Sequence, residues 1–179
     1  MARDQGAVLQ VRDYTATEFL RDGSTVEIRA LRPEDRAGML AAMGRTSQQS
    51  LYRRFFTFKR GFTDREVDFY VDVDFVDHVA LVAVMKEDGQ QVIVAGGRYI
   101  VVRAGEAEVA FVVDDAHQRR GLGASLLRHL AALARQAGLK VLSADVLPEN
   151  AAMLKVFETS GLGIITRREP DSIHVMLQL

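Results

Sequence analysis

The chain has 179 residues, of which 48% are hydrophobic and 26% charged, and its formal net charge is −1. This length and composition fit one globular domain with a sizeable core. The charge balance argues against nucleic-acid binding, which needs a basic face, and the absence of cysteine excludes disulfides, thiolate metal sites and cysteine nucleophiles. With no membrane-length apolar run and no signal-peptide core at the amino terminus, we expect a cytoplasmic protein that does not bind membranes.

Residues 1–23 are weakly patterned, and we interpret them as a lead-in or arm before a domain at 24–179. Apolar periodicity and turn residues predict the elements that follow. In chain order they are a strand at 25–31, helices from 32, at 47–56 and at 63–73, strands at 78–85, 92–102 and 107–113, a helix at 122–137, a strand at 141–147, a short helix from 150 to 161 and a strand at 174–179. This order predicts an α/β protein with a mixed sheet and helices on both faces.

The stretch Gln118-Arg-Arg-Gly-Leu-Gly-Ala124 lies between a predicted strand and a predicted helix. Backbone N–H groups converge at such a junction, the helix dipole favours negative charge, and glycine allows a phosphate to approach closely. A Rossmann fingerprint would need a third glycine in the first βα unit, and a Walker loop would need a Lys-Ser/Thr pair. The sequence therefore predicts a phosphate-binding loop of another kind.

Two polar residues flank this loop at a distance in the sequence. Glu108 heads an otherwise apolar strand, where alternation places it on one face with Ala110 and Val112. It is interpreted either as a solvated carboxylate at a strand end or as a general base that points into a cleft. Asn150 is predicted to cap the helix that follows it.

Three segments together resemble the GNAT superfamily of acyl-CoA-dependent N-acyltransferases, and the resemblance covers residues 22–179. They are the loop from Gln118 to Ala124, the strand from Ala107 to Phe111, and the set Asn150, Met153, Gly161 and Leu162. The resemblance implies a GNAT fold: a mixed, mostly antiparallel sheet of six to seven strands flanked by four to five helices. It also implies acetyl-CoA as cosubstrate and no metal.

The resemblance further implies roles for individual residues. Glu108 is the general base that removes a proton from the acceptor amine. Val112, Val113 and Asn150 contact the pantetheine arm. The residues implied to cradle the pyrophosphate are Gln118, Arg119, Arg120, Gly121, Leu122, Gly123 and Ala124.

One position departs from the pattern of many GNAT enzymes. Phe157 stands where they carry a tyrosine that protonates the leaving thiolate. The thiolate then leaves unassisted, or water or another group serves. Asp145 is a weaker candidate for proton transfer, with a structural contact to the loop as the alternative, and His117 is the one histidine near the loop.

A narrower resemblance points to the acceptor. Residues 22–35, 50–56 and 145–154 are similar to the bacterial protein-lysine acetyltransferases that modify AMP-forming acyl-CoA synthetases. This likeness implies direct transfer to a protein lysine by a stand-alone catalytic domain, without the fused domains of larger relatives. Two alternatives stay open: acetylation of a small-molecule amine, and a non-catalytic module that binds or senses acyl-CoA. The sequence makes no prediction of oligomeric state.

Overall fold

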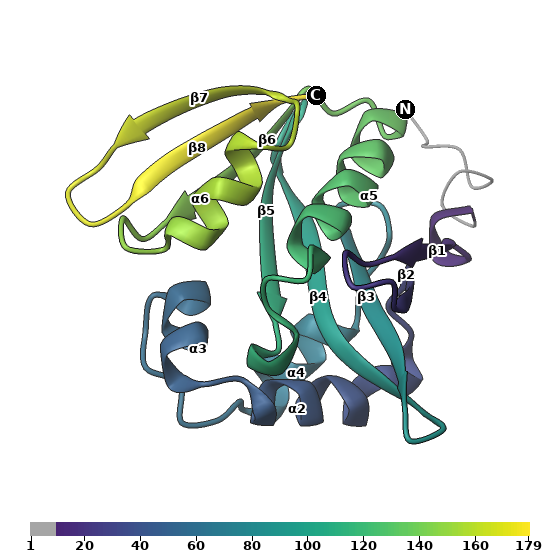
Figure 1. Ribbon diagram of the computed structural model, residues 1–179. Helices are drawn as coiled ribbons and strands as arrows, with labels where there is room; N and C mark the ends of the chain where they lie inside the picture. The colour runs from purple at the N-terminus through teal and green to yellow at the C-terminus, as the bar shows by residue number, and fades with distance from the viewer. Residues whose placement is uncertain (1–9) are drawn as a thin grey trace.

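The structure is a computed structural model that describes residues 10–179, and an eight-stranded sheet runs through its centre (Figure 1). The strands in chain order are β1 (Thr15–Phe19), β2 (Thr25–Ala30), β3 (His78–Glu87), β4 (Gln90–Arg103), β5 (Glu106–Val113), β6 (Val141–Val146), β7 (Gly163–Arg168) and β8 (Ile173–Gln178). The α-helices are α2 (Arg36–Arg45), α3 (Gln48–Phe55), α4 (Asp64–Val71), α5 (Leu122–Gln136) and α6 (Ala151–Glu158). Their arrangement confirms the predicted α/β class and the mixed, mostly antiparallel sheet.

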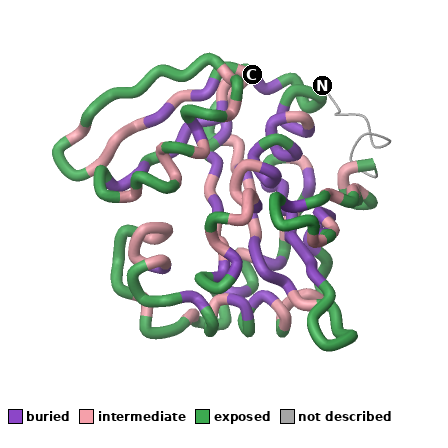
Figure 2. The backbone as a smooth tube through the Cα atoms, in the orientation of Figure 1, coloured by how far each residue is buried: buried purple, intermediate pink, exposed green. Residues whose placement is uncertain are grey.

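The sheet has more strands than the six to seven predicted, because β1 and β7 were missed. β1 lies within the stretch interpreted as an arm, and it pairs with β2 from Thr15 to Phe19. It contains no buried residue, and all six residues of β7 are exposed (Figure 2). Edge strands without a buried face carry no strong apolar alternation, which is the signal that sequence reading depends on. Residues 1–9 of the predicted arm lie outside the described residues.

The sheet opens between its two parallel strands. The strands lie in the order β1-β2-β3-β4-β5-β6-β8-β7, and every neighbouring pair is antiparallel except β5 and β6. These two pair only from Glu106 opposite Val141 to Glu108 opposite Ser143. Beyond this point β6 continues to pair with β8, whereas β5 pairs with β4. The two strands therefore separate immediately after Glu108.

Helices cover both faces of the sheet. Helix α5, predicted at 122–137, packs on the larger core through a face of buried leucines, which consists of Leu122, Leu126, Leu127, Leu130 and Leu133. On the opposite face α2 packs over β3 and β4, and α4 packs against α2. Along β5, Val109 and Phe111 are buried, whereas Glu108 is exposed and Val112 is half-buried. β5 thus presents one face to the core and the other to the cleft described below.

Helix α6 is anchored to the sheet by two aromatic side chains. Phe157 is 1% exposed, and its ring centroid lies 6.3 Å from that of Phe111. Gly97 on β4 makes room for Phe111, since a Cβ at Gly97 would lie 2.8 Å from the Phe111 ring. Among residues 10–179, no helix is long and apolar enough to cross a membrane.

Candidate active site

A cleft of about 900 Å³ occupies the gap where β5 and β6 separate. Its walls are the exposed side of β5, the end of β6, the loop before α5, and helices α3 and α6. Among the sequence-predicted site residues, those that line it are Glu108, Val112, Val113, Gln118, Arg119, Gly121, Leu122, Gly123, Ala124 and Asn150. The structure thus brings together residues that lie up to 42 positions apart, counted from Glu108 to Asn150.

The loop before α5 has the backbone shape of an anion site. Arg119 and Gly121 have φ values of 62° and 97°, in the left-handed region that glycine tolerates and other residues adopt at a cost. Helix α5 begins at Leu122, so the first N–H groups of the helix have no intrahelical acceptor. A Cβ at Gly121 would meet no atom within 4 Å, which shows open space at this point. Free N–H groups, open space and the positive end of the helix dipole suit a pyrophosphate.

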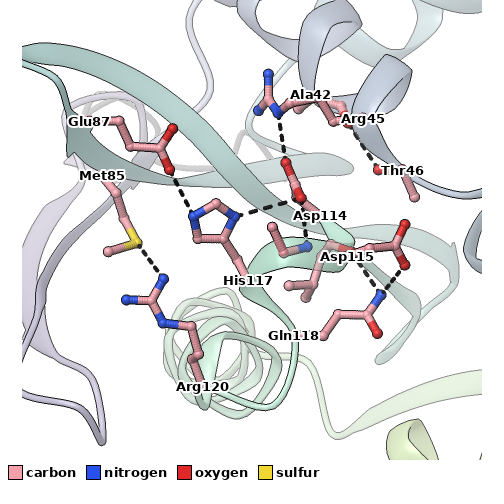
Figure 3. A network of polar contacts seen from close by, with 12 residues as sticks. Ala42, Arg45, Thr46, Met85, Glu87, Asp114, Asp115, His117, Gln118 and Arg120 are labelled. Carbon is pink, nitrogen blue, oxygen red and sulfur yellow. Dashed lines mark hydrogen bonds and ion pairs between the residues drawn. The ribbon is translucent and has the colours of Figure 1, made fainter.

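A polar network centred on the buried residues Asp114 and His117 lies next to the loop (Figure 3). The His117 Nε2 atom is 2.8 Å from Glu87 Oε1, and its Nδ1 atom is 3.6 Å from Asp114 Oδ1. The Asp114 carboxylate also accepts hydrogen bonds from the Ala116 N–H at 3.0 Å and from Arg45 Nε at 2.7 Å. His117 thus supports the loop, and it is only 9% exposed. It also forms part of the cleft wall.

Gln118 joins the loop to α3. Its side-chain amide donates to Ser50 Oγ at 3.1 Å, to the Val113 carbonyl at 3.2 Å and to Asp115 Oδ1 at 2.9 Å. Asp115 in turn accepts hydrogen bonds from Ser50 Oγ at 2.6 Å and from the Ser47 N–H. Burial acts to raise the pKa of Asp115, but these hydrogen bonds outweigh it and lower the pKa. The carboxylate form therefore ties the start of α3 to the loop.

The side chain of Arg120 does not line the cleft. It points to the β1–β2 turn, where it contacts Asp22 Oδ2 at 2.8 Å and donates to Ser24 Oγ at 2.8 Å (Figure 3 shows its further contact with Met85). Its guanidinium is therefore engaged away from the predicted phosphate position. Only the backbone of Arg120 remains part of the loop.

Glu108 lies at the point where the sheet opens. It stands opposite Ile100 on β4 and Ser143 on β6, in the interior of the sheet. Glu108 is nevertheless exposed, and it lines the cleft where β5 and β6 separate. The carboxylate is thus accessible from outside while its neighbours Val109 and Phe111 remain in the core.

The far wall of the cleft is formed by α6 and β6. Asn150 caps α6, since its side chain accepts a hydrogen bond from the Met153 N–H at 3.3 Å. This confirms the predicted cap. The structural alternative for Asp145 was a contact with the loop. Asp145 instead pairs with His174 Nδ1 on β8 at 2.8 Å. The loop lies on the other side of the cleft, so the partner of Asp145 comes from the neighbouring antiparallel strand.

Sequence reading missed the contribution of α3 to the site. Arg53, Arg54, Phe55 and Phe56 line the cleft, although no local pattern placed this helix beside Glu108. The signals in this segment were the adjacent pair of arginines within an aromatic run and the resemblance that covers residues 50–56. Among residues 10–179, no group of histidine, aspartate and glutamate side chains is arranged to hold a metal ion.

A splayed sheet, a helix start suited to a phosphate and an exposed carboxylate beside it form the arrangement expected of an acyl-CoA-dependent N-acyltransferase. The sequence profile of the acetyltransferase (GNAT) family matches residues 46–163. The acetyltransferase PA5475 of Pseudomonas aeruginosa is 33% identical over 155 residues, which are 86% of this chain and 82% of that protein. The chain therefore belongs to the acetyltransferase (GNAT) family, whose cosubstrate is acetyl-CoA.

Two further relatives share the arrangement. The acetyltransferase Pat of Mycolicibacterium smegmatis is 34% identical over 146 residues, which are 79% of this chain but only 42% of Pat. The crystal structure of the GNAT domain of Streptomyces lividans PAT is 32% identical, with a TM-score of 0.84, and the match covers 99% of this chain and 100% of that domain. The chain thus corresponds to an entire GNAT domain and to less than half of Pat.

Proposed function

We propose that the chain acetylates a lysine side chain of a protein, with an AMP-forming acyl-CoA synthetase as the expected acceptor. The observation that carries the proposal is the exposure of Glu108 on an interior strand, beside the phosphate-binding loop. An uncovered carboxylate is accessible to a lysine on a large folded acceptor, whereas a small-molecule site is typically enclosed. The full-length match to the GNAT domain of S. lividans PAT supports the same acceptor class.

The cleft offers separate positions for the parts of the cosubstrate. We assign the pyrophosphate to the free N–H groups at Gly121–Ala124, with Arg119 adding positive charge. The exposed side of β5 at Val112 and Val113 and the start of α6 at Asn150 flank the pantetheine arm. Acetyl-CoA supplies the acetyl group as a thioester. These residues orient it so that the acceptor amine approaches from the side of Glu108.

The proposed role of Glu108 is to remove a proton from the ammonium group of the acceptor lysine. A lysine with a pKa near 10.4 is almost entirely ammonium at neutral pH, which costs roughly 4–5 kcal/mol for a nucleophilic amine. A carboxylate within reach accepts that proton, directly or through a water molecule. Because the chain has no cysteine, no cysteine acyl-enzyme forms, and we propose direct transfer between the two bound substrates.

Phe157 has a structural role in this proposal and no catalytic one. It is buried against Phe111 and holds α6 onto the sheet. A phenylalanine donates no proton, so we propose that the CoA thiolate leaves without a tyrosine acid. We also propose a cytoplasmic location.

Mixing the protein with labelled acetyl-CoA and an AMP-forming acyl-CoA synthetase tests the proposal. Transfer of label to a synthetase lysine is the expected result, and the Glu108→Gln variant is the control that separates enzymatic from spontaneous acetylation. Thiol release with small amines alone would instead identify a metabolite acetyltransferase. Tight binding of acetyl-CoA without any release would identify a binding module.

A further inference from the structure

The cleft is more positive than the chain as a whole. Seven of its lining residues are lysine, arginine, aspartate or glutamate, and five of these are cationic: Arg21, Arg53, Arg54, Arg119 and Lys155, against Glu108 and Asp145. The whole chain, by contrast, has a net charge of −1. Arg119 belongs to the phosphate-binding loop, and Arg21 precedes Asp22, which contacts that loop through Arg120. These two cations therefore lie on the side of the cleft that is assigned to the phosphates of the cosubstrate, whereas Arg53 and Arg54 belong to α3.

Arg53 and Arg54 have no carboxylate partner in the described part of the chain. Neither takes part in an ion pair, and the Nε atom of Arg53 is buried without a hydrogen-bond partner. Arg54 packs over the ring of Phe55 at 4.8 Å, a contact that leaves its in-plane donors unused. A buried N–H without an acceptor destabilises the protein, and arginine remains charged at any accessible pH. Such a pair on a cleft wall is expected to meet an anion.

The surroundings of Arg54 add to this charge imbalance. Burial lowers the pKa of Arg54, while the nearby Tyr70 and Glu108 act in the opposite direction. Burial and the charge of Arg54 together lower the pKa of Arg98 on β4 to about 10. Arg98 itself contacts the Tyr70 carbonyl at 3.2 Å and His78 Nε2 at 2.9 Å, both of which are neutral groups. Arg98 is therefore a second cation close to Arg54. Glu108 is the carboxylate that acts on Arg54 from the cleft.

We propose that Arg53 and Arg54 form a carboxylate-binding subsite on the acceptor side of the cleft, next to Glu108. The planar guanidinium matches a carboxylate with paired hydrogen bonds, and partial burial strengthens them. The inference rests on the proposed acyl transfer. A carboxylate reaches this position from either of two sources: an acidic side chain adjacent to the target lysine, or the free end of a dicarboxylic acyl group on CoA.

The test uses two substrate pairs that differ in one carboxylate. The first pair is a lysine peptide with aspartate or asparagine beside the lysine, with acetyl-CoA as donor. The second pair is succinyl-CoA and acetyl-CoA, with the asparagine peptide as acceptor. We expect the native protein to prefer the acidic member of one pair by about tenfold in kcat/KM, which corresponds to about 1.4 kcal/mol. The pair that shows the preference identifies the source.

The variants Arg53→Gln and Arg54→Gln are expected to abolish this preference, because the rate with the acidic substrate falls about tenfold further than the rate with its neutral counterpart. Arg167→Gln is the matched control, because Arg167 is an exposed arginine on β7 that pairs with Glu169 outside the cleft. It should leave the preference unchanged. Equal kcat/KM for the two members of both pairs in the native protein, or an equal loss in all three reactions in the Arg54 variant, overturns the subsite. The equal loss would assign Arg54 to supporting Glu108 alone.

Binding measurements test the subsite independently of the proposed acyl transfer. If neither peptide is acetylated, protein-lysine acetylation is wrong for these acceptors, and affinities then decide the subsite. Titration calorimetry of the two acyl-CoAs and fluorescence anisotropy of the two peptides require no turnover. Tighter binding of an acidic member that disappears in Arg54→Gln supports the subsite, and equal affinities in both pairs overturn it.

Discussion

The two sides of the cleft are built in different ways. The side that we assign to the phosphates, called the phosphate side below, is a single stretch, 118–124, whose shape depends on left-handed backbone at two positions and on the start of a helix. The acceptor side depends on α3, which is held against the loop by side-chain contacts. One of these is the hydrogen bond from Ser50 to Asp115, two residues that lie 65 positions apart in the sequence. A site made of backbone geometry can be recognised locally, whereas a site made of side-chain contacts depends on the whole fold.

The two sides also differ in how their charges are used. On the phosphate side, Arg120 is paired with Asp22, whereas Arg119 lines the cleft. On the acceptor side, Arg54 and Arg98 lie close together without a carboxylate in contact. Chemistry and specificity are therefore expected to respond to changes on the acceptor side, and cosubstrate affinity to changes on the phosphate side.

The largest expected effect is that of Glu108→Gln on the acceptor side. Loss of the base should lower kcat by about 10²–10⁴-fold near neutral pH, with the KM for acetyl-CoA unchanged. The deficit should shrink at high pH, where the acceptor amine is already neutral in solution. The measurement is kcat against pH. Glu106→Gln, two residues earlier on β5 and paired with Arg103, is the control and should keep its activity. A variant with native rates at every pH would remove Glu108 from the mechanism.

The second effect is on stability and concerns His78, which lies outside the cleft lining and contacts Arg98. Burial, followed by the charge of Arg98, lowers the pKa of His78 to about 4, from 6.5 in the unfolded chain. Between these values the unfolded chain binds a proton that the folded protein does not, so the free energy of unfolding falls as pH falls. The contribution is roughly 3 kcal/mol between about pH 7 and pH 4.

Urea unfolding of the native protein and His78→Gln at pH 7.5 and pH 4.5 measures this contribution. The native protein should lose more free energy of unfolding on acidification than the variant does. Because His78 Nε2 lies 2.9 Å from Arg98 Nη1, the neutral ring is the form that accepts this bond. Identical acid sensitivity in the two proteins would contradict the assigned role of His78.

The third effect concerns the phosphate side. Gly121→Ala places a Cβ on a residue with φ of 97°, at a cost of about 1–2 kcal/mol, in the loop that holds the pyrophosphate. We expect the KM for acetyl-CoA to rise about tenfold while kcat changes little. Gly89→Ala is the matched control, because Gly89 has a similar φ of 83° in the β3–β4 turn. Both variants should lose similar thermal stability, and an equal rise of KM in both would show that the effect is global.

The smallest effect is expected at Asn150, where α6 begins. Asn150→Ala removes the side-chain acceptor for the Met153 N–H and should cost about 1 kcal/mol of stability, with a several-fold rise in the KM for acetyl-CoA. Asn150→Ser retains a capping oxygen and should restore most of the stability. Thermal unfolding and initial rates report both quantities. If serine restores stability but not KM, the amide itself contacts the cosubstrate; if it restores neither, the capping account is wrong.

Much of the fold could be predicted because most elements have a buried face. The leucine stripe of α5 and the apolar strands β3 to β6 carry strong periodicity, and their bounds agree with the prediction within a few residues. Edge strands β1 and β7 lack a buried face and were missed. Within the site, Arg120 was assigned by its place in the loop, but the direction of its side chain depends on Asp22, which is 98 residues away.

The sequence by itself predicted the glycine loop at 118–124, the strand with Glu108 and the helix cap at Asn150, because each is a local pattern with a local physical cause. The GNAT family was indicated by the resemblance of three segments taken together. Only the tertiary structure decided that β5 and β6 separate directly after Glu108 and that α3 lies beside it. It also decided that Arg53 and Arg54 face the cleft without a carboxylate partner among the described residues. Strand register and side-chain pairing across the sheet depend on packing between distant segments, which no local pattern specifies.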